Sequence, residues 1–203
     1  MKLFGTHTSP YARKVRIVLA EKKIDYDLVI DAPRSPDSAV PLHNPLGRIP
    51  VLVLDDQTPV FDSPVIVEYL DNVTPNNKLM PQPNRERMEV KRWEALADGL
   101  LDSAVAIRNE SLRKAKEQNA EWIALHRSAI DRTLAFMAEE LGEKAYCMGT
   151  HFGLADIAVG CALGYLDFRF AELDWRQTHP NLARLYEKLE QRPSFQETMP
   201  RDA

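Results

Sequence analysis

The sequence predicts an α/β domain followed by an all-helical domain, and three observations support this fold class. The first part of the chain alternates short β-rich runs with helical segments. The stretch TPNNKLMPQPN, rich in proline and asparagine, then interrupts this pattern as a linker does. After it, apolar side chains recur at helical spacing only. We therefore expect an α/β domain over residues 1–76, a linker over 77–84 and an all-α domain over 85–203.

The α/β part reads as a βαβ unit followed by a ββα unit. The β-rich runs KLFGTH and DYDLVID flank a helical segment, Pro10–Lys23, so the first two strands should be parallel. PVLVLDD predicts a third strand, and a short fourth strand is expected around Val60. Ser63 and Pro64 then suit the N-cap and the first position of a second helix.

The second part of the chain predicts four main helices. The first helix is long, and the second is expected over residues 120–141. The third is expected to begin after Gly153, which places Asp156 at position N3. The fourth is expected over 181–191 and should stop at Arg192-Pro193. The apolar positions expected to face the core are Met88, Trp93, Leu96, Ala97, Leu100, Leu101, Ala104 and Val105 on the long helix, and Trp122, Leu125, Ile130, Leu134 and Met137 on the next.

Composition and residue spacing argue against several function classes. A net charge of −4 over 203 residues argues against a nucleic-acid binder. The longest apolar run, IPVLVL, is too short for a membrane span, and the histidines show no metal-ligand spacing. Cys147 and Cys161 do not form a disulfide framework, so we expect buried cysteines in a cytoplasmic protein. The basic runs are expected to be solvated helix faces: Arg13, Lys14 and Arg16, and Arg113, Lys114 and Lys116.

Ser9 stands where the first strand gives way to the first helix and has three possible roles. As a nucleophile it lacks a G-x-S-x-G elbow, and only His7, on the presumed strand, is near in sequence. With Pro10 at the first helical position, Ser9 is expected to be the N-cap. The same helix end favours an anion such as a thiolate, to which the hydroxyl could donate. The cap and the ligand donor both stay open.

Two further dipeptides allow either a structural or a ligand-binding role. Ile49-Pro50 stands at the start of a strand, and a cis bond there would turn the Ile49 N–H and C=O outward, toward a peptide-like ligand. Asp62-Ser63 can cap the second helix, or bind the ammonium and carboxylate groups of an amino acid.

Five stretches in register resemble the cytosolic glutathione S-transferases. They are TSPYARKVR, NPLGRIPVL, FDSPVIVEYL, FGLADIAVG and RPSFQETMP, and they cover almost the whole chain. The chain is most similar to bacterial theta-like, serine-type members. The resemblance implies a thioredoxin-like N-terminal domain, an all-helical C-terminal domain and a homodimer.

The resemblance also implies a role for each candidate residue. Ser9 would stabilise the thiolate of glutathione, and the Ile49 backbone, before cis-Pro50, would pair with its cysteinyl part. Asp62 and Ser63 would hold its γ-glutamyl group. The glycyl carboxylate would need a donor from the loop before the third strand, where three candidates stand: Arg34, His43 and Arg48.

The implied activity is transfer of glutathione, as a co-substrate and without a cofactor or metal, to an apolar electrophile. The electrophile would bind near Tyr11 and the part of the long helix that includes Ala104 and Arg108. Relatives that perform thiol–disulfide chemistry have a cysteine where Ser9 stands, so an enzyme thiol is not expected here. Two alternatives stay open: a glutathione-binding regulatory protein without turnover, and a glutathione-dependent peroxidase.

Overall fold

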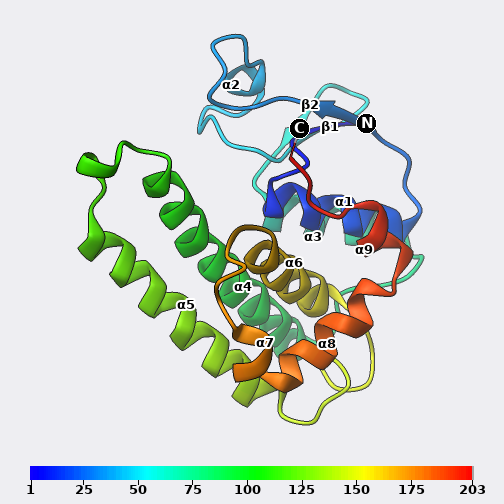
Figure 1. Cartoon of the computed structure of the whole chain (residues 1–203). Helices are drawn as coiled ribbons and strands as arrows, with labels where there is room; N and C mark the ends of the chain where they lie inside the picture. The colour runs from blue at the N-terminus through cyan, green and yellow to red at the C-terminus, as the bar shows by residue number, and fades with distance from the viewer. Residues whose placement is uncertain (203) are drawn as a thin grey trace. The chain divides into compact units, whose positions relative to one another are not determined.

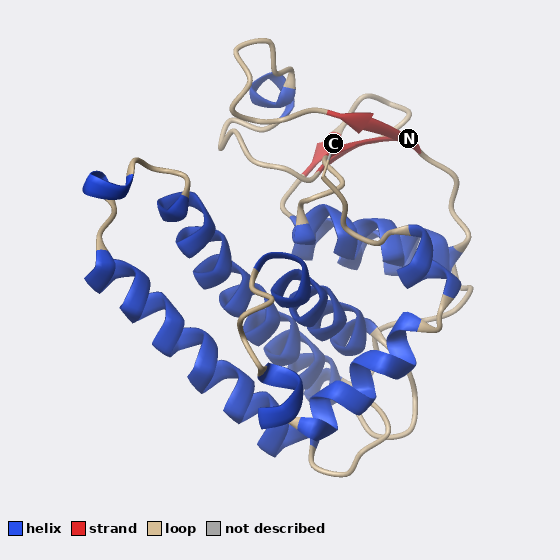
Figure 2. Ribbon diagram, in the orientation of Figure 1, coloured by secondary structure: helices blue, strands red, loops and turns tan. Residues whose placement is uncertain are grey.

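The computed structural model describes residues 1–202 and divides into two compact units, an α/β unit and a helical unit (Figure 2). The first unit comprises Met1–Pro81 together with the chain from Glu190 onward, and the second comprises Gln82–Leu189. This confirms the predicted fold class. The predicted boundaries of the linker stay a prediction, and the contacts of the C-terminal segment group it with the first unit.

A four-stranded mixed sheet organises the first unit. Its order is β2-β1-β3-β4, with β1 and β2 parallel and β3 antiparallel to both β1 and β4. The strands are β1 (Lys2–Gly5), β2 (Asp27–Ile30), β3 (Val51–Val53) and β4 (Pro59–Val60). The predicted βαβ and ββα order is therefore confirmed.

Helices cover both faces of this sheet (Figure 1). α1 (Pro10–Lys22) and α3 (Ser63–Val73) pack side by side on one face, and the short α2 (Val40–His43) lies on the other. A last helix, α9 (Pro193–Glu197), packs against α1.

One predicted helix start is wrong, and one short helix was not predicted. Ser63 is the first helical residue rather than the N-cap, because Asp62 has an extended backbone and its C=O accepts the Ile66 N–H at 3.0 Å. The helix expected over 181–191 stops before Arg192-Pro193, as predicted, because α8 (Pro180–Glu190) ends at Glu190. Pro193 then begins α9, a short helix that the sequence did not predict, since a proline lacks only an N–H that the first turn leaves unpaired anyway.

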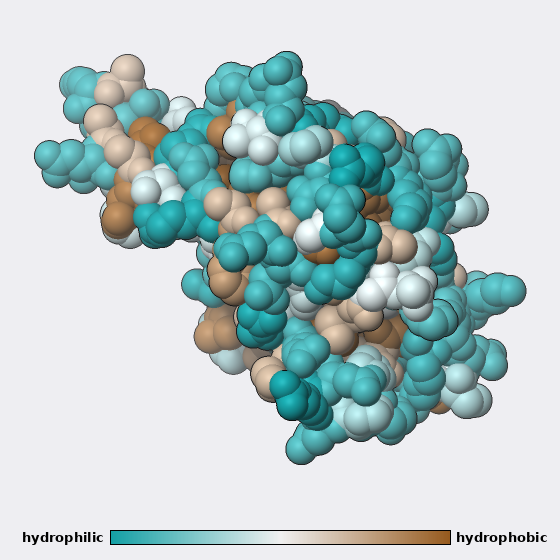
Figure 3. Space-filling model, turned by 90° about the horizontal axis from the view of Figure 1, so that it is seen from below, coloured by the Kyte–Doolittle hydropathy of each residue, from teal (hydrophilic) through white to brown (hydrophobic). Residues whose placement is uncertain are grey.

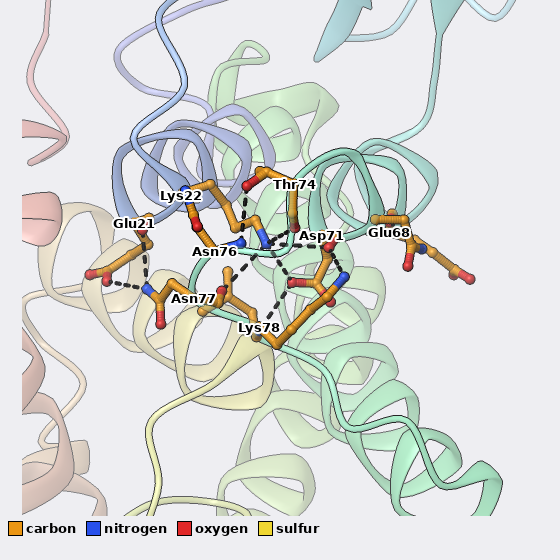
Figure 4. A network of polar contacts seen from close by, with 10 residues as sticks. Glu21, Lys22, Glu68, Asp71, Thr74, Asn76, Asn77 and Lys78 are labelled. Carbon is orange, nitrogen blue, oxygen red and sulfur yellow. Dashed lines mark hydrogen bonds and ion pairs between the residues drawn. The ribbon is translucent and has the colours of Figure 1, made fainter.

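A buried ion pair fixes the C-terminal ends of α1 and α3 (Figure 4). Lys22 Nζ lies 3.2 Å from Asp71 Oδ1, and the two side chains are 0% and 2% exposed. Nζ also donates to the carbonyl of Thr74 at 3.1 Å, and the same carboxylate oxygen accepts the Leu79 N–H at 2.9 Å. This network joins the two helices whose N-terminal ends carry candidate site residues.

The basic face of α1 is buried, which corrects the expectation of a solvated face for Arg13, Lys14 and Arg16. Arg13 Nη2 donates to the Phe195 carbonyl and Arg16 Nη2 to the Glu197 carbonyl, each at 3.3 Å. Both carbonyls belong to α9, where a helix end leaves oxygens unpaired and favours cations. The second basic run, around Arg113, is exposed as expected.

In the helical unit, α4 (Asn84–Ser111) packs against α5 (Ala120–Leu141) and α6 (Leu154–Arg169). α6 is buried over most of its length and begins as predicted: the Gly153 N–H donates to Asp156 Oδ2 at 2.9 Å. Asp156 Oδ1 accepts the N–H of Cys147, and this cysteine and Cys161 are buried as expected. The elements are α4 (Asn84–Ser111), the 3-10 turn η1 (Ala115–Glu117), α5 (Ala120–Leu141), α6 (Leu154–Arg169), α7 (Trp175–Thr178) and α8 (Pro180–Glu190).

Three residues predicted to face the core are exposed instead. They are Met88, Trp122 and Leu125, and each is about half exposed. Helical spacing shows which face of a helix is apolar, but it does not show how far along the helix a neighbouring element packs against that face. The face drawn in Figure 3 is mostly hydrophilic, with apolar residues in separate spots. Within residues 1–202, every helix is too short or too polar to cross a lipid bilayer.

Candidate functional site

The sheet register brings three loop segments to one edge. β3 runs antiparallel to β1 with Val51 opposite Phe4, so β3 starts where β1 ends. β4 runs antiparallel to β3 with Val60 opposite Leu52, so β4 ends where β3 starts. The chain leaving β1, the chain entering β3 and the chain leaving β4 therefore meet at the same edge.

Each of these three segments carries residues singled out in the sequence. Ser9 follows β1, Ile49 and Pro50 precede β3, and Asp62 and Ser63 follow β4. The fold thus gathers all five from positions far apart in the chain. Helix N-termini contribute at two of the three segments, where α1 and α3 begin.

Ser9 is the N-cap of α1, as predicted. Its backbone is extended, with φ −75° and ψ 118°, and its Oγ accepts the Ala12 N–H at 3.2 Å. The end of β1 lies directly against this turn: a Cβ placed at Gly5 would come within 2.9 Å of Ala12 Cβ. Glycine at the strand end therefore permits the close approach that positions Ser9.

The Ser9 hydroxyl keeps its proton available. Accepting from Ala12 is its sole hydrogen bond within residues 1–202, so the O–H can still donate to a ligand. The side chain is half-buried at a helix N-terminus, where an anion is favoured. His7 lies in the turn between β1 and α1 rather than on the strand, and its ring contacts Arg201, not Ser9. The geometry gives no nucleophilic pair.

Ile49 is anchored by its side chain and offers its backbone. The Ile49-Pro50 peptide bond is cis. The Ile49 side chain packs against a buried cluster that includes Phe4 and Val51. Its N–H and C=O join none of the turn and loop hydrogen bonds in the described chain. A free amide and carbonyl beside a strand start can pair with an extended peptide.

Asp62 and Ser63 leave the start of α3 uncapped. Asp62 is exposed, and its carboxylate makes no cap hydrogen bond. Ser63 is 2% exposed and its hydroxyl bonds to no other described residue. Phe61, just before them, packs on the same buried cluster as Ile49. An unpaired helix N-terminus beside a free carboxylate suits a ligand that carries both a carboxylate and an ammonium.

Three residues were named as candidates for binding a ligand carboxylate from the loop before β3: Arg34, His43 and Arg48. His43, at the end of α2, is half-buried with its ring 4.9 Å from the Phe4 ring. Arg34 and Arg48 are exposed and form no ion pair with another described residue. Their geometry does not single out one of the three.

The three second-substrate candidates belong to different units. Tyr11 lies in the first turn of α1 and is half-buried, whereas Ala104 and Arg108 lie on α4 in the helical unit. Ala104 is completely buried, which argues against direct contact of its side chain with a ligand. Arg108 is half-exposed. A shared pocket for these residues stays a prediction.

A cationic cluster beside α1 was missed by sequence reasoning. His7, Arg16 and Arg201 line one pocket, and Arg201 Nη2 lies 3.5 Å from His7 Nε2. Burial lowers the pKa of His7, and the charges of Arg16 and Arg201 lower it further. The basic run on α1 can be recognised in the sequence, but the C-terminal segment that packs against it lies at the other end of the chain. No cluster of metal-ligating side chains occurs among residues 1–202.

Comparisons with known proteins agree with this geometry. The family model for the glutathione S-transferase N-terminal domain matches residues 8–73, and that for the C-terminal domain matches residues 120–188. An uncharacterized GST-like protein of Escherichia coli K12, YibF, is 37% identical over 200 residues, which is 98% of each chain.

Two solved structures are similar over nearly their full length. A glutathione S-transferase of Methylobacillus flagellatus KT with glutathione bound is 48% identical with a TM-score of 0.96, over 98% of this chain and 99% of that one. A glutathione S-transferase of Methylobacterium radiotolerans in complex with glutathione sulfonate is 42% identical with a TM-score of 0.95, over 100% and 95%.

Proposed function

Because this chain belongs to the glutathione S-transferase family, we propose that it binds glutathione at the sheet edge described above and transfers it to an electrophilic small molecule. The observation that carries the proposal is the meeting of three segments at one edge: the Ser9 turn, the Ile49-Pro50 turn and the start of α3. Each offers a group that a different part of glutathione requires. Similar proteins bind glutathione or its sulfonate in their structures.

Ser9 is the proposed catalytic residue, which makes the protein a serine-type enzyme of the bacterial theta-like group. Its hydroxyl accepts from Ala12 and donates to the glutathione sulfur, while the helix N-terminus favours the thiolate. Lowering the thiol pKa from about 8.5–9 toward 7 favours the ionised form by roughly 2–3 kcal/mol. The thiol proton leaves to solvent, and the thiolate forms a carbon–sulfur bond to the electrophile. The electrophile's bond to its leaving group breaks at the same carbon, so that a halide departs with the bonding electron pair, or an epoxide oxygen keeps the pair and takes a proton from solvent.

The rest of glutathione is held by groups that are unpaired among the described residues. The Ile49 N–H and C=O pair with its cysteinyl part, as a short antiparallel strand would. The Ser63 hydroxyl and the start of α3 bind the γ-glutamyl carboxylate, and Asp62 pairs with the γ-glutamyl ammonium. Arg34, His43 or Arg48 binds the glycyl carboxylate.

The proposed assembly is a cytoplasmic homodimer. α3 exposes an apolar strip at four-residue spacing, formed by Val65, Tyr69 and Val73, which are 51%, 36% and 49% exposed. Residues four apart lie on one face of a helix, so the strip is continuous and suits a second copy of the chain.

Calorimetry with glutathione, followed by an electrophile panel that includes aryl halides, epoxides and a hydroperoxide, tests the activity. We expect binding, and turnover of at least one carbon electrophile. Ser9→Ala should leave binding largely intact but remove the ultraviolet absorbance of the bound thiolate. Binding without any turnover would favour the regulatory alternative, and turnover of the hydroperoxide alone would favour the peroxidase. Absence of glutathione binding would reject the proposal.

A further inference from the structure

Two buried arginines lie in the first two turns of α1, and neither has a carboxylate partner in the described part of the chain. Arg13 is 2% exposed and Arg16 is 7% exposed. Arg13 Nη2 donates to the Phe195 carbonyl at 3.3 Å, and its Cζ lies 5.5 Å from the centroid of the Phe195 ring. The Nε and Nη1 of Arg13 are also buried and have no hydrogen-bond partner among residues 1–202. A carbonyl and an aromatic ring hold this guanidinium in place, but neither carries a charge that would neutralise it.

The opposite end of the same helix shows how this chain balances another buried cation. Lys22 Nζ lies 3.2 Å from a carboxylate oxygen of Asp71, and both side chains are almost completely buried (Figure 4). Buried charges normally have such a partner, because removing an unpaired charge from water is costly. Arg13 instead leaves an unbalanced positive charge beside the start of α1, since a guanidinium keeps its proton in proteins.

Arg13 lies one helical turn after Ser9. The Arg13 N–H donates to the Ser9 carbonyl at 2.9 Å, which closes the first turn of α1. Residues four apart lie on one face of a helix, about 6 Å apart along its axis. The buried charge therefore adds to the effect of the helix N-terminus, whose unpaired N–H groups favour an anion at the same place. A glutathione thiolate at Ser9 would be the anion that balances both.

We propose that Arg13 is a positioning residue of the glutathione site, whose buried charge favours the thiolate at Ser9 without touching glutathione. This inference rests on the proposed function. The charge acts through the protein interior, where it is screened less than it would be in water. At a separation of about 10 Å and an effective dielectric constant of about 20, a unit charge shifts a pKa by about one unit. Ser9 supplies a hydrogen bond and Arg13 supplies charge, so the two contributions are separate.

The pKa of the thiol of bound glutathione tests the proposal, and the ultraviolet absorbance of the thiolate measures it at saturating glutathione. Arg13→Gln and Arg13→Met both remove the charge. The thiol pKa should therefore rise by about one unit, and the ratio of thiolate to thiol near neutral pH should fall about tenfold. Arg13→Lys keeps the charge and should restore most of the wild-type pKa. Because Arg13 is buried, two neutral variants are compared, and either one decides the outcome if the other fails to fold.

A salt titration of the wild type needs no variant. A buried charge is little screened by dissolved ions, so about 1 M salt should leave the thiol pKa of bound glutathione nearly unchanged. A return of this pKa to the value of free glutathione would show that exposed charges are responsible, and would overturn the role of Arg13.

Two control variants separate charge from packing. Phe195→Leu removes the ring beside the guanidinium but keeps the charge, so it should lower stability without moving the thiol pKa. Arg113→Gln removes an exposed arginine of the helical unit and should also leave the thiol pKa unchanged. The titratable groups on neighbouring segments are the same in all these proteins: His7 before α1, Asp62 before α3 and Glu197 on α9.

The possible failures are distinguishable. The role of Arg13 is overturned, and the proposed function stands, if wild type lowers the thiol pKa but neither neutral variant raises it. The same holds if Arg13→Lys behaves like Arg13→Gln, or if Phe195→Leu moves the thiol pKa as far as the neutral variants do. A wild type that binds glutathione without shifting its thiol pKa would reject the ionisation step of the proposed function, and the role of Arg13 with it.

Discussion

Ser9 combines two roles that substitution can separate. Its oxygen caps α1 by accepting the Ala12 N–H, and its proton is free to meet the glutathione sulfur. Alanine at an N-cap costs about 1 kcal/mol of stability, whereas glycine costs only a few tenths. Both remove the donor. We therefore expect Ser9→Ala and Ser9→Gly to lose a similar share of kcat/KM, about tenfold or more, while only Ser9→Ala is clearly less stable.

Urea unfolding and steady-state kinetics on the same preparations measure these two effects. Ser9→Thr, which keeps both a cap oxygen and a hydroxyl, serves as the control and should keep most of the activity. Activity that follows stability across the three variants would show that Ser9 is a cap alone.

Asp62 provides a second prediction at the residue scale. Its carboxylate is exposed and takes no part in capping α3, so its removal should cost little stability. If it pairs with the γ-glutamyl ammonium, Asp62→Asn should weaken glutathione binding about tenfold, the effect of one lost charge-assisted hydrogen bond. Isothermal calorimetry measures the affinity. Asp25→Asn removes another exposed carboxylate outside the site and should bind as wild type does.

At the element scale, the site depends on α1 and α3 keeping their places, and Lys22 holds them. Lys22→Met keeps most of the side-chain volume but leaves the Asp71 carboxylate buried without its cation. Breaking a buried pair in this way costs about 3–5 kcal/mol. Chemical denaturation should show a loss of this size. Lys23→Met, at the neighbouring exposed position, should stay within about 0.5 kcal/mol of wild type, and equal effects of both changes would contradict the assignment.

The contact between α1 and the C-terminal segment should depend on pH through Glu21. Its carboxylate accepts from Arg192 at 2.8 and 2.9 Å and from Ser194 at 2.6 Å. Burial raises the pKa of Glu21, but the hydrogen bonds from Arg192 and Ser194 outweigh burial and leave the pKa below its ordinary value of 4.5. The stabilisation is therefore complete above this value and is lost as the pH falls through the lower folded-state pKa.

Thermal unfolding of wild type and Glu21→Gln between pH 7 and pH 3 measures this dependence. We expect wild type to be more stable at pH 7 and the difference in Tm to shrink below about pH 4.5. A difference that stays constant across the range would show that the charge of Glu21 contributes nothing.

At the scale of the whole molecule, local patterns predicted local features well. The alternation of β-rich and helical segments predicted the βαβ and ββα order, and the Ser-Pro pair predicted the N-cap of α1. Both features depend on residues that are close together in the chain. The burial of Arg13 and Arg16 was not predictable, since their partners are carbonyls 182 and 181 residues away. For the same reason the cationic pocket was missed. The residues of the candidate site could be singled out because they carry their own turn and cap signals, whereas their roles toward glutathione rest on the family resemblance and stay a proposal.

The proposed homodimer is the last property that belongs to the whole molecule. The α3 strip of Val65, Tyr69 and Val73 is the apolar surface we expect a second copy to cover. Tyr69→Glu would place a charge in the strip, and burying an unpaired charge opposes association. Sedimentation velocity should find wild type as a dimer and Tyr69→Glu shifted toward monomer. Gln191→Glu adds the same charge at an exposed position outside the strip and should remain dimeric. A monomeric wild type, or a dimer indifferent to Tyr69→Glu, would place the interface elsewhere or remove it.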